Sequence, residues 1–182
     1  MLFRSNPGGA KPSGSLEIPS SIIGYTVVGI GAKAFYSCTS LTDVSIPASV
    51  TNIGLSAFFN CVRLESFNVA SGNKSYKSVD NMLLTKDGKE LVCGVTGEVT
   101  IPSGVTTIGY AAFQAISPTS VTIPDSVTAI GVYAFANCRK LTSVTIPSSV
   151  TYVGVSAFYC ADRKSTRLNS SHTTVSRMPS SA

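Results

Sequence analysis

Histidine and tryptophan are nearly missing from this sequence, which has no tryptophan and only one histidine, His172. Ser-His-Asp and Cys-His catalytic sites need an imidazole base, so the rest of the chain has no means of building either. The sequence also has no Cys-x-x-Cys pair, which argues against a zinc site. Its acidic residues are scattered along the chain rather than paired. The sequence therefore predicts no catalytic residue, no metal site and no enzyme activity.

Long apolar runs and a strong charge of one sign are missing as well. Glycine, proline and polar residues interrupt every apolar stretch well short of the roughly 20 residues that cross a bilayer, so no membrane insertion is predicted. The chain has 14 basic and 9 acidic residues. Several of these lie at the two ends: Arg4, Asp162, Arg163, Lys164, Arg167 and Arg177. Without them the balance is 9 against 8, a net charge of +1, so no nucleic acid is predicted as a partner.

The two ends of the chain differ from everything between them. One back-translation of Asp162–His172 resembles a sequencing-library adapter, and the reverse complement of one back-translation of Met1–Ser5 gives the same DNA string. We therefore expect residues 1–5 and 162–182 to be adapter-like artefacts, the latter disordered. Residues 6–15 are expected to be a linker or partial repeat. The part between resembles an open reading frame on a short DNA fragment, as in metagenomic sequence. A natural Ser/Arg-rich tail is the alternative.

What the chain does have is an internal repeat of 23 residues. Val121–Ser143 reads VTIPDSVTAIGVYAFANCRKLTS, and the same motif begins again at Val144 with VTIPSSVTYVGVSAF. Earlier copies run over Val44–Ser66 and Val99–Ser120, and a divergent copy with an insertion runs over Leu16–Asp43. A fixed period of this length is typical of a solenoid, in which each unit covers the apolar side of the next.

Each recurring position has a predicted structural role. The motif Val-Thr-Ile-Pro alternates apolar and polar residues, so it predicts a short strand that the proline ends. A glycine recurs where a turn needs positive φ or a close backbone approach. A short helical turn with an Ala-Phe pair then places five phenylalanines in one interior column: Phe35, Phe58, Phe113, Phe135 and Phe158. The predicted fold is a repeat solenoid, mainly β with short helical turns.

The unit V-T-I-P-x-S-V-T-x-I-G-x-x-A-F-x-x-C-x-x-L-T-S resembles the BspA-type leucine-rich repeat over residues 16–161. The resemblance implies a right-handed leucine-rich-repeat array of about six turns, cut from a longer array. It also implies a non-catalytic scaffold of a bacterial cell-surface or secreted protein, which binds a protein or glycan ligand and mediates adhesion. A passive structural spacer and an accessory repeat module of a larger enzyme are the alternatives.

One unit departs from the pattern, the irregular repeat over residues 67–98. In it, Asp87-Gly88 separates two extended runs and predicts a hairpin with a type I′ turn. This unit is interpreted as an embellished repeat, with a protruding lysine-bearing loop as the alternative. Asn73-Lys74-Ser75 fits a glycosylation acceptor in a eukaryotic secretory pathway. The run Gly29–Ala34 mimics a dinucleotide fingerprint, but the repeat accounts for its residues, so no cofactor is predicted.

Two sets of equivalent positions complete the prediction. Cys38, Cys61 and Cys138 share one interior position and are expected to be small apolar core residues, their redox state left open. The outward positions of the predicted sheet form a ladder that is a candidate interaction surface: Glu17, Ser45, Asn68, Thr100, Thr122 and Thr145. Their small polar groups suit an extended contact with a protein or glycan, although soluble, β-favourable residues explain them equally well.

Overall fold

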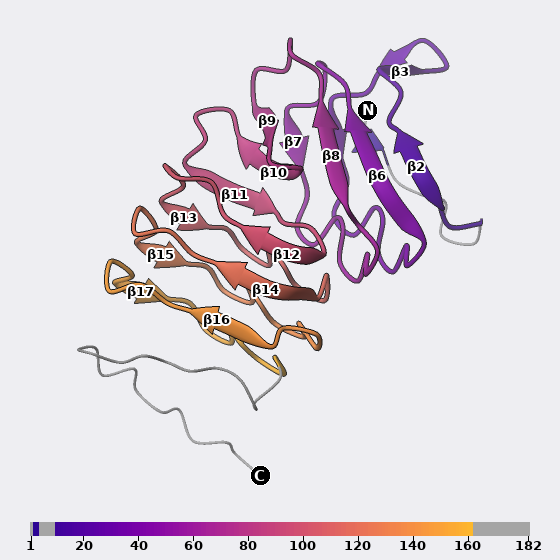
Figure 1. Cartoon of the computed structure of the whole chain (residues 1–182). Helices are drawn as coiled ribbons and strands as arrows, with labels where there is room; N and C mark the ends of the chain where they lie inside the picture. Colours follow the sequence, from indigo (N-terminus) through magenta and orange to yellow (C-terminus); the bar gives the residue numbers. More distant parts are fainter. Residues whose placement is uncertain (1, 4–9, 162–182) are drawn as a thin grey trace.

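The computed structural model describes residues 2–3 and 10–161. The predicted adapter-like tail, most of the predicted adapter-like head and part of the predicted linker lie outside the described residues. Within them the chain winds into a stack of coils, with the N-terminal units at one end and the C-terminal units at the other (Figure 1). Parallel pairing between successive coils confirms the predicted β-solenoid.

One side of the coils forms two parallel sheets. The N-terminal sheet contains β2 (Gly14–Glu17), β6 (Leu41–Ile46) and β8 (Ser66–Val69). The C-terminal sheet contains β12 (Gly97–Thr100), β14 (Pro118–Thr122) and β16 (Ser143–Thr145). Equivalent repeat positions pair, as Val99 does with Val121 and Val121 with Val144, because each coil brings the same residue next to its copy. Figure 1 shows the two sheets turned relative to each other.

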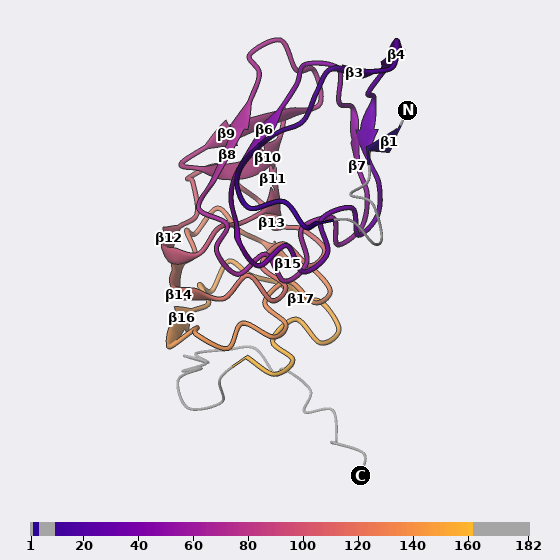
Figure 2. The same ribbon diagram turned by 90° about the vertical axis from the view of Figure 1, so that its right-hand side faces the viewer.

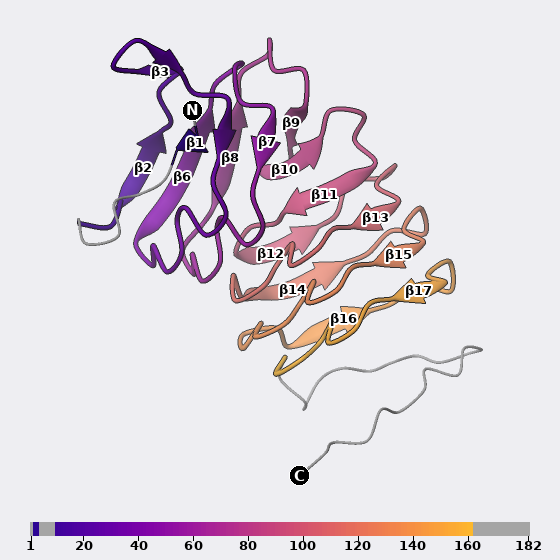
Figure 3. The ribbon, with the colours of Figure 1, turned by 180° about the vertical axis from the view of Figure 1, so that it is seen from behind.

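A second side of the coils carries mostly two-residue strands. In the N-terminal half these are β1 (Leu2–Phe3), β5 (Gly29–Ile30) and β7 (Asn52–Ile53). The C-terminal half has β13 (Thr107–Ile108), β15 (Ala129–Ile130) and β17 (Tyr152–Val153). These last three continue a six-stranded sheet that begins with β9 (Tyr76–Val79), β10 (Met82–Thr85) and β11 (Glu90–Cys93). Figure 3 shows this second side from behind, with β11, β13, β15 and β17 in succession.

The Ala-Phe segment is not the predicted helical turn but a succession of reverse turns. In each regular unit the residues two and six positions after the glycine have positive φ, as Tyr133 (57°) and Asn137 (58°) do. Alternate amides donate within the segment, such as Ala136 N to Tyr133 O at 3.0 Å. The amides between them donate to the next unit, such as Phe135 N to Ala157 O at 2.7 Å. This pairing with the neighbouring coil offsets the cost of left-handed residues that are not glycine.

The repeat glycine is required by a close approach between coils. A Cβ on Gly54 would lie 2.3 Å from the backbone nitrogen of Ala32, and a Cβ on Gly154 would lie 2.4 Å from that of Val132. Neither glycine has positive φ. Of the two reasons that the sequence offers for this glycine, the structure therefore selects the close backbone approach.

The buried phenylalanines form two columns rather than the predicted single one. Neighbouring rings stack at 5.0–5.4 Å within each column: Phe35 and Phe58, then Phe113, Phe135 and Phe158. The columns do not join, because Phe58 packs edge-on against Phe67 of the irregular repeat, with ring centroids 5.1 Å apart. The prediction of one continuous column is therefore wrong, and the break lies at the irregular repeat.

The irregular repeat folds into two consecutive hairpins. β9 and β10 pair through Asp80 and Asn81, which both have positive φ (48° and 65°) and form a two-residue turn that the sequence analysis did not predict. The predicted hairpin around Asp87-Gly88 is confirmed by the antiparallel pairing of β10 with β11. Its turn is not type I′, because Gly88 alone of the pair has positive φ. A carboxylate oxygen of Asp87 instead accepts the Lys89 amide at 3.0 Å.

The insertion in the first unit forms a small hairpin of its own. Its strands are β3 (Ser21–Ile22) and β4 (Tyr25–Thr26). Ile23 and Gly24 connect them with positive φ values of 49° and 78°. Figure 2 shows this hairpin projecting from the N-terminal end of the stack.

The predicted interior cysteines are buried free thiols. Burial raises the pKa of the Cys61 and Cys138 thiols to about 12, so both are protonated at neutral pH. Cys93 is a further buried thiol, and Cys160 is exposed. Within residues 2–3 and 10–161, no helix has the length and apolar character needed to cross a membrane.

Candidate functional site

The predicted interaction ladder divides into two rows of paired residues. The N-terminal row is Glu17, Ser45 and Asn68, and the C-terminal row is Thr100, Thr122 and Thr145. All are exposed except Ser45, which is half-buried. Asn68 and Thr100 belong to different sheets, since the irregular repeat carries the chain from one sheet to the other. The structure thus brings these six residues together as two short polar surfaces rather than one.

A carboxylate fixed by two hydroxyl groups lies beside the N-terminal row. Ser66 Oγ and Thr42 Oγ1 each donate a hydrogen bond to Asp43 at 2.6 Å. These bonds hold the pKa of Asp43 below its ordinary value, so the group stays ionised at neutral pH. The sequence gives no sign of this arrangement, because Ser66 reaches Asp43 only from the next coil.

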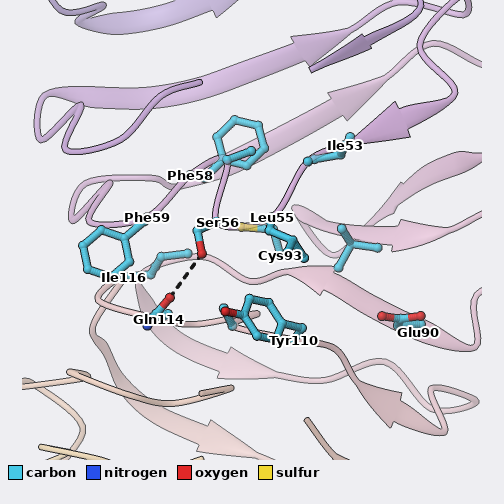
Figure 4. A pocket seen from close by; sticks show the side chains of 14 residues that line it. Ile53, Leu55, Ser56, Phe58, Phe59, Glu90, Cys93, Tyr110, Gln114 and Ile116 are labelled. Carbon is cyan, nitrogen blue, oxygen red and sulfur yellow. Dashed lines mark hydrogen bonds between the residues drawn. The ribbon is translucent and has the colours of Figure 1, made fainter. Parts of the chain in front are cut away.

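A pocket of about 140 Å³ opens on the side of the molecule that carries the Ala-Phe segments, which we call the turn side. It lies between two Ala-Phe segments that the irregular repeat separates. Residues 53–59 form one wall, and residues between 110 and 116 form the other. Glu90, Val92 and Cys93 of the irregular repeat lie between them. We call this space the seam pocket. Figure 4 shows Phe59 and Gln114 at one end of it and Glu90 at the other.

The pocket exists because the irregular repeat has no Ala-Phe segment. After β11 its chain crosses directly to β12, and Gly94 makes the one backbone hydrogen bond to the following Ala-Phe segment, from its amide to Ala112 O at 2.9 Å. A Cβ on Gly94 would lie 1.9 Å from the Phe113 ring. The short crossing therefore covers the end of the C-terminal phenylalanine column but leaves the outer part of the segment uncovered.

Backbone groups that other units pair with their neighbours are open at the seam pocket. Where one Ala-Phe segment lies directly against the next, the amides two, four and six positions after the glycine donate to the next coil, as Lys33, Phe35 and Ser37 do. The equivalent amides of Ser56, Phe58 and Asn60 have no hydrogen-bond partner in the described chain. On the facing segment, the carbonyl groups of Tyr110 and Gln114 likewise accept no hydrogen bond from the described residues. The two walls thus present unused donors on one side and unused acceptors on the other.

The polar side chains of the seam pocket are few. Ser56 Oγ reaches Gln114 Oε1 across the pocket at 3.4 Å (Figure 4). Glu90 is half-buried, and its carboxylate makes no ion pair within the described chain. It is the one carboxylate in the lining, and no lysine or arginine accompanies it. Nearby, Tyr76 Oη accepts a hydrogen bond from the Ile53 amide at 3.1 Å. Burial raises the pKa of the Tyr76 phenol, and the negative charge of Glu90 raises this pKa further.

The turn side also carries part of the exposed apolar surface of the molecule, the rest lying mainly on the β3–β4 hairpin and on β17. Leu55 and Tyr110 are 65% and 44% exposed at the rim of the seam pocket. Equivalent turn positions in other units expose Tyr36, Val155 and Tyr159. Tyrosines of this kind are enriched in the cores of protein interfaces. The turn side therefore has the anchoring groups that the two polar rows lack.

The reactive side chains in the lining of the seam pocket are the Cys93 thiol and the Glu90 carboxylate. Burial raises the pKa of the Cys93 thiol well above its ordinary value, which removes it as a nucleophile. Nowhere in residues 2–3 and 10–161 do three or more histidine, cysteine or acidic side chains gather as metal ligands. The chemistry available is hydrogen bonding, apolar contact and one negative charge.

The repeat geometry agrees with a known family. The model of the BspA type leucine rich repeat region matches residues 13–84 and 92–178 in six copies. This chain belongs to the BspA-type leucine-rich-repeat family. The gap between the two matched ranges runs from the end of β10 to the start of β11, in the second hairpin of the irregular repeat. The second range extends into residues 162–182, the stretch interpreted from the sequence as adapter-like.

Solved bacterial proteins share this BspA-type fold. A leucine-rich repeat protein from Eubacterium ventriosum is 30% identical with a TM-score of 0.66, over 78% of this chain and 38% of its own. A leucine rich cell surface protein from Faecalibacterium prausnitzii is 25% identical with a TM-score of 0.58, over 87% of this chain and 60% of its own. The chain thus spans less than two thirds of either protein. Among curated proteins, none matches this chain.

One suggested modification site of this BspA-type chain is excluded by its geometry. Asn73 is fully buried. Its Nδ2 donates to Pro47 O and Val50 O, both at 2.9 Å. Its Oδ1 accepts the amides of Ser75 and Tyr76 at 2.9 and 2.8 Å. A side chain with all its hydrogen bonds made inside the fold cannot accept a glycan in the folded protein, so the glycosylation hypothesis is wrong for the folded state.

Proposed function

We propose that this BspA-type chain is a non-catalytic, protein-binding repeat module of a bacterial cell-surface or secreted protein, and that it mediates adhesion. The module corresponds to residues 16–161, the part that carries the repeats. The observation that supports binding most strongly is the set of exposed tyrosine and aliphatic side chains on the turn side, centred on Leu55 and Tyr110. A cell-surface relative in Faecalibacterium prausnitzii supports the location.

The turn side and the polar rows are two candidate binding faces. Aromatic and aliphatic anchors usually contribute most of the binding free energy at protein interfaces, which favours the turn side for a protein ligand. The rows Glu17–Ser45–Asn68 and Thr100–Thr122–Thr145 remain candidates for an extended polar contact with a protein or glycan. Substitutions on each face distinguish the two.

The test is a binding screen of the full chain against purified extracellular-matrix proteins and a glycan array, by biolayer interferometry. We expect saturable binding to at least one protein, and we expect the double variant Leu55→Ser and Tyr110→Ser to weaken it about tenfold or more. Thr122→Arg tests the polar face, and Asp125→Asn is the matched surface control. Circular dichroism confirms that each variant is folded.

The rival functions give different results. A passive spacer shows no saturable binding to any ligand of the panel, and this outcome would contradict the proposal. An accessory module of an enzyme predicts a catalytic domain in the full reading frame, which sequencing of intact genomic DNA would reveal. Such sequence would also test the adapter-like interpretation of residues 1–5 and 162–182.

A further inference from the structure

We propose that the seam pocket binds an extended segment of a protein partner that carries a lysine or arginine, the basic side chain pairing with Glu90. This inference rests on the proposed protein-binding function and names the kind of partner. It is carried by the open backbone groups, the unpaired charge and the size of the pocket.

The open backbone groups call for another stretch of backbone. Ser56 and Phe58, whose amides are open, belong to one wall of the pocket, and Tyr110 and Gln114, whose carbonyl groups are open, belong to the other. In the regular array a neighbouring segment supplies the matching carbonyl and amide groups. An extended peptide presents carbonyl and amide groups alternately to its two sides, so it can accept from one wall and donate to the other, as added strands do at sheet edges.

The charge at the end of the pocket specifies the partner's side chain. Glu90 lies half-buried with no lysine or arginine in the described lining of the pocket, and it faces the same space as the apolar side chains of Ile53 and Val92. A lysine or arginine can lay its aliphatic stem along Leu55 and the ring of Tyr110 while its charged end reaches the carboxylate. A neutral or acidic side chain at this position leaves Glu90 unpaired or repelled.

The volume of the pocket argues against a small-molecule ligand. Sites for small molecules and cofactors usually enclose about 300–1,000 Å³, whereas the seam pocket holds about 140 Å³. That space suits one side chain. The remainder of the ligand must then run along the mouth of the pocket, between the exposed Leu55 and Tyr110, so that its backbone meets the open groups of both walls while one side chain enters the pocket.

The experiment uses the full chain and the fluorescein-labelled peptide acetyl-Thr-Ser-Val-Arg-Val-Ser-Thr-amide. Fluorescence anisotropy is expected to show saturable binding. Replacing the peptide's arginine by citrulline, which has the same shape without the charge, should weaken binding about tenfold or more. Glu90→Gln should cause the same loss with the arginine peptide and no further loss with the citrulline peptide, as a double-mutant cycle requires. Methylation of alternate peptide nitrogens should also abolish binding.

The control is Asp125→Asn, which removes an exposed carboxylate elsewhere and should leave the affinity unchanged. Equal binding of the arginine and citrulline peptides, or no saturation up to about 1 mM peptide, would overturn the inference. So would a dimer that forms through this pocket and is lost in Glu90→Gln, seen by sedimentation velocity. If a matrix protein binds and Thr122→Arg abolishes it while Glu90→Gln does not, this inference fails and the protein-binding function stands.

Discussion

Replacement of Asn73 by alanine should be among the most destabilising changes in the irregular repeat. The side chain is fully buried and makes four hydrogen bonds, two to carbonyl groups of the preceding unit and two to amides of its own loop. Each bond contributes about 1 kcal/mol net, and the buried partners left behind cost more. We therefore expect Asn73→Ala to lower the free energy of unfolding by about 3–5 kcal/mol, a large part of the roughly 5–15 kcal/mol typical of a folded domain.

Asn73→Asp sharpens the test because it keeps the shape of the side chain. The carboxylate still accepts the amides of Ser75 and Tyr76, but it can donate nothing to Pro47 O and Val50 O. A charge facing two carbonyl oxygens in a buried site should cost at least as much as the alanine substitution. If only the space filled by the side chain mattered, aspartate would instead be tolerated.

The measurement is urea unfolding followed by circular dichroism, with Asn68→Ala as the matched control. Asn68 is exposed on β8, so its loss should change the free energy of unfolding by less than about 0.5 kcal/mol. An Asn73→Ala variant as stable as the wild type would refute the reasoning. It would mean that the loop after β8 does not depend on contact with the preceding unit.

Four further predictions concern the phenylalanine column, the crossing at Gly94 and the cysteines. Phe135→Ala, which empties the middle of a stacked column, should lower the free energy of unfolding by about 3–5 kcal/mol in the same urea assay. Gly94→Ala should lower the midpoint of thermal unfolding, since its Cβ would lie 1.9 Å from a ring of the next unit, while Gly72→Ala, with a nearest contact of 3.5 Å, should not; equal midpoints would contradict this close packing. A thiol reagent at neutral pH should label Cys160 and spare Cys61 until the chain unfolds. Because burial raises the pKa of Cys61 from 9.0 to about 12, its protonated thiol favours the folded state below pH 9.0 and loses this effect as pH rises toward about 12, so the stability difference from Cys61→Ala should shrink over that range.

The repeat itself was predictable because one physical requirement acts at every copy. Val121, Val144 and their equivalents must cover the apolar side of the neighbouring coil, so the same residue types recur at a fixed period. The strands of the regular units, their register and the burial of Cys38, Cys61 and Cys138 follow from that period. The repeat glycine was also predictable, although the sequence could not decide between positive φ and a close approach.

The Ala-Phe segment shows what the period does not reveal. The positive-φ position two residues after the glycine is occupied by Lys33, Ala111 or Tyr133 among others, none of which signals a left-handed conformation from sequence. The conformation is imposed by hydrogen bonds to the adjacent coil, such as Tyr133 N to Val155 O at 3.2 Å. A prediction from local residues therefore gives a helical turn, and only the contact between coils corrects it.

The candidate site was hidden for a related reason. Outward polar positions can be identified from residues that are present, whereas the seam pocket arises from a segment that the irregular repeat lacks. A signal was present, since residues 67–98 contain no Gly-x-x-Ala-Phe motif. The missing motif predicts open backbone amides only if one knows that the carbonyl groups of each Ala-Phe segment accept hydrogen bonds from the unit before it, and the structure alone shows this.

The missing Ala-Phe segment explains why unpaired amides and unpaired carbonyl groups of the described chain occur together at the seam pocket. An Ala-Phe segment accepts three hydrogen bonds from the unit before it and donates three to the unit after it, as the segment around Phe135 does. Removing one segment from the stack therefore exposes donors on one side and acceptors on the other. The crossing at Gly94 satisfies one acceptor, Ala112 O, and covers the phenylalanine ring beneath. The array thus keeps its core covered while leaving backbone groups of the turn side open, and these groups are where we propose that a partner binds.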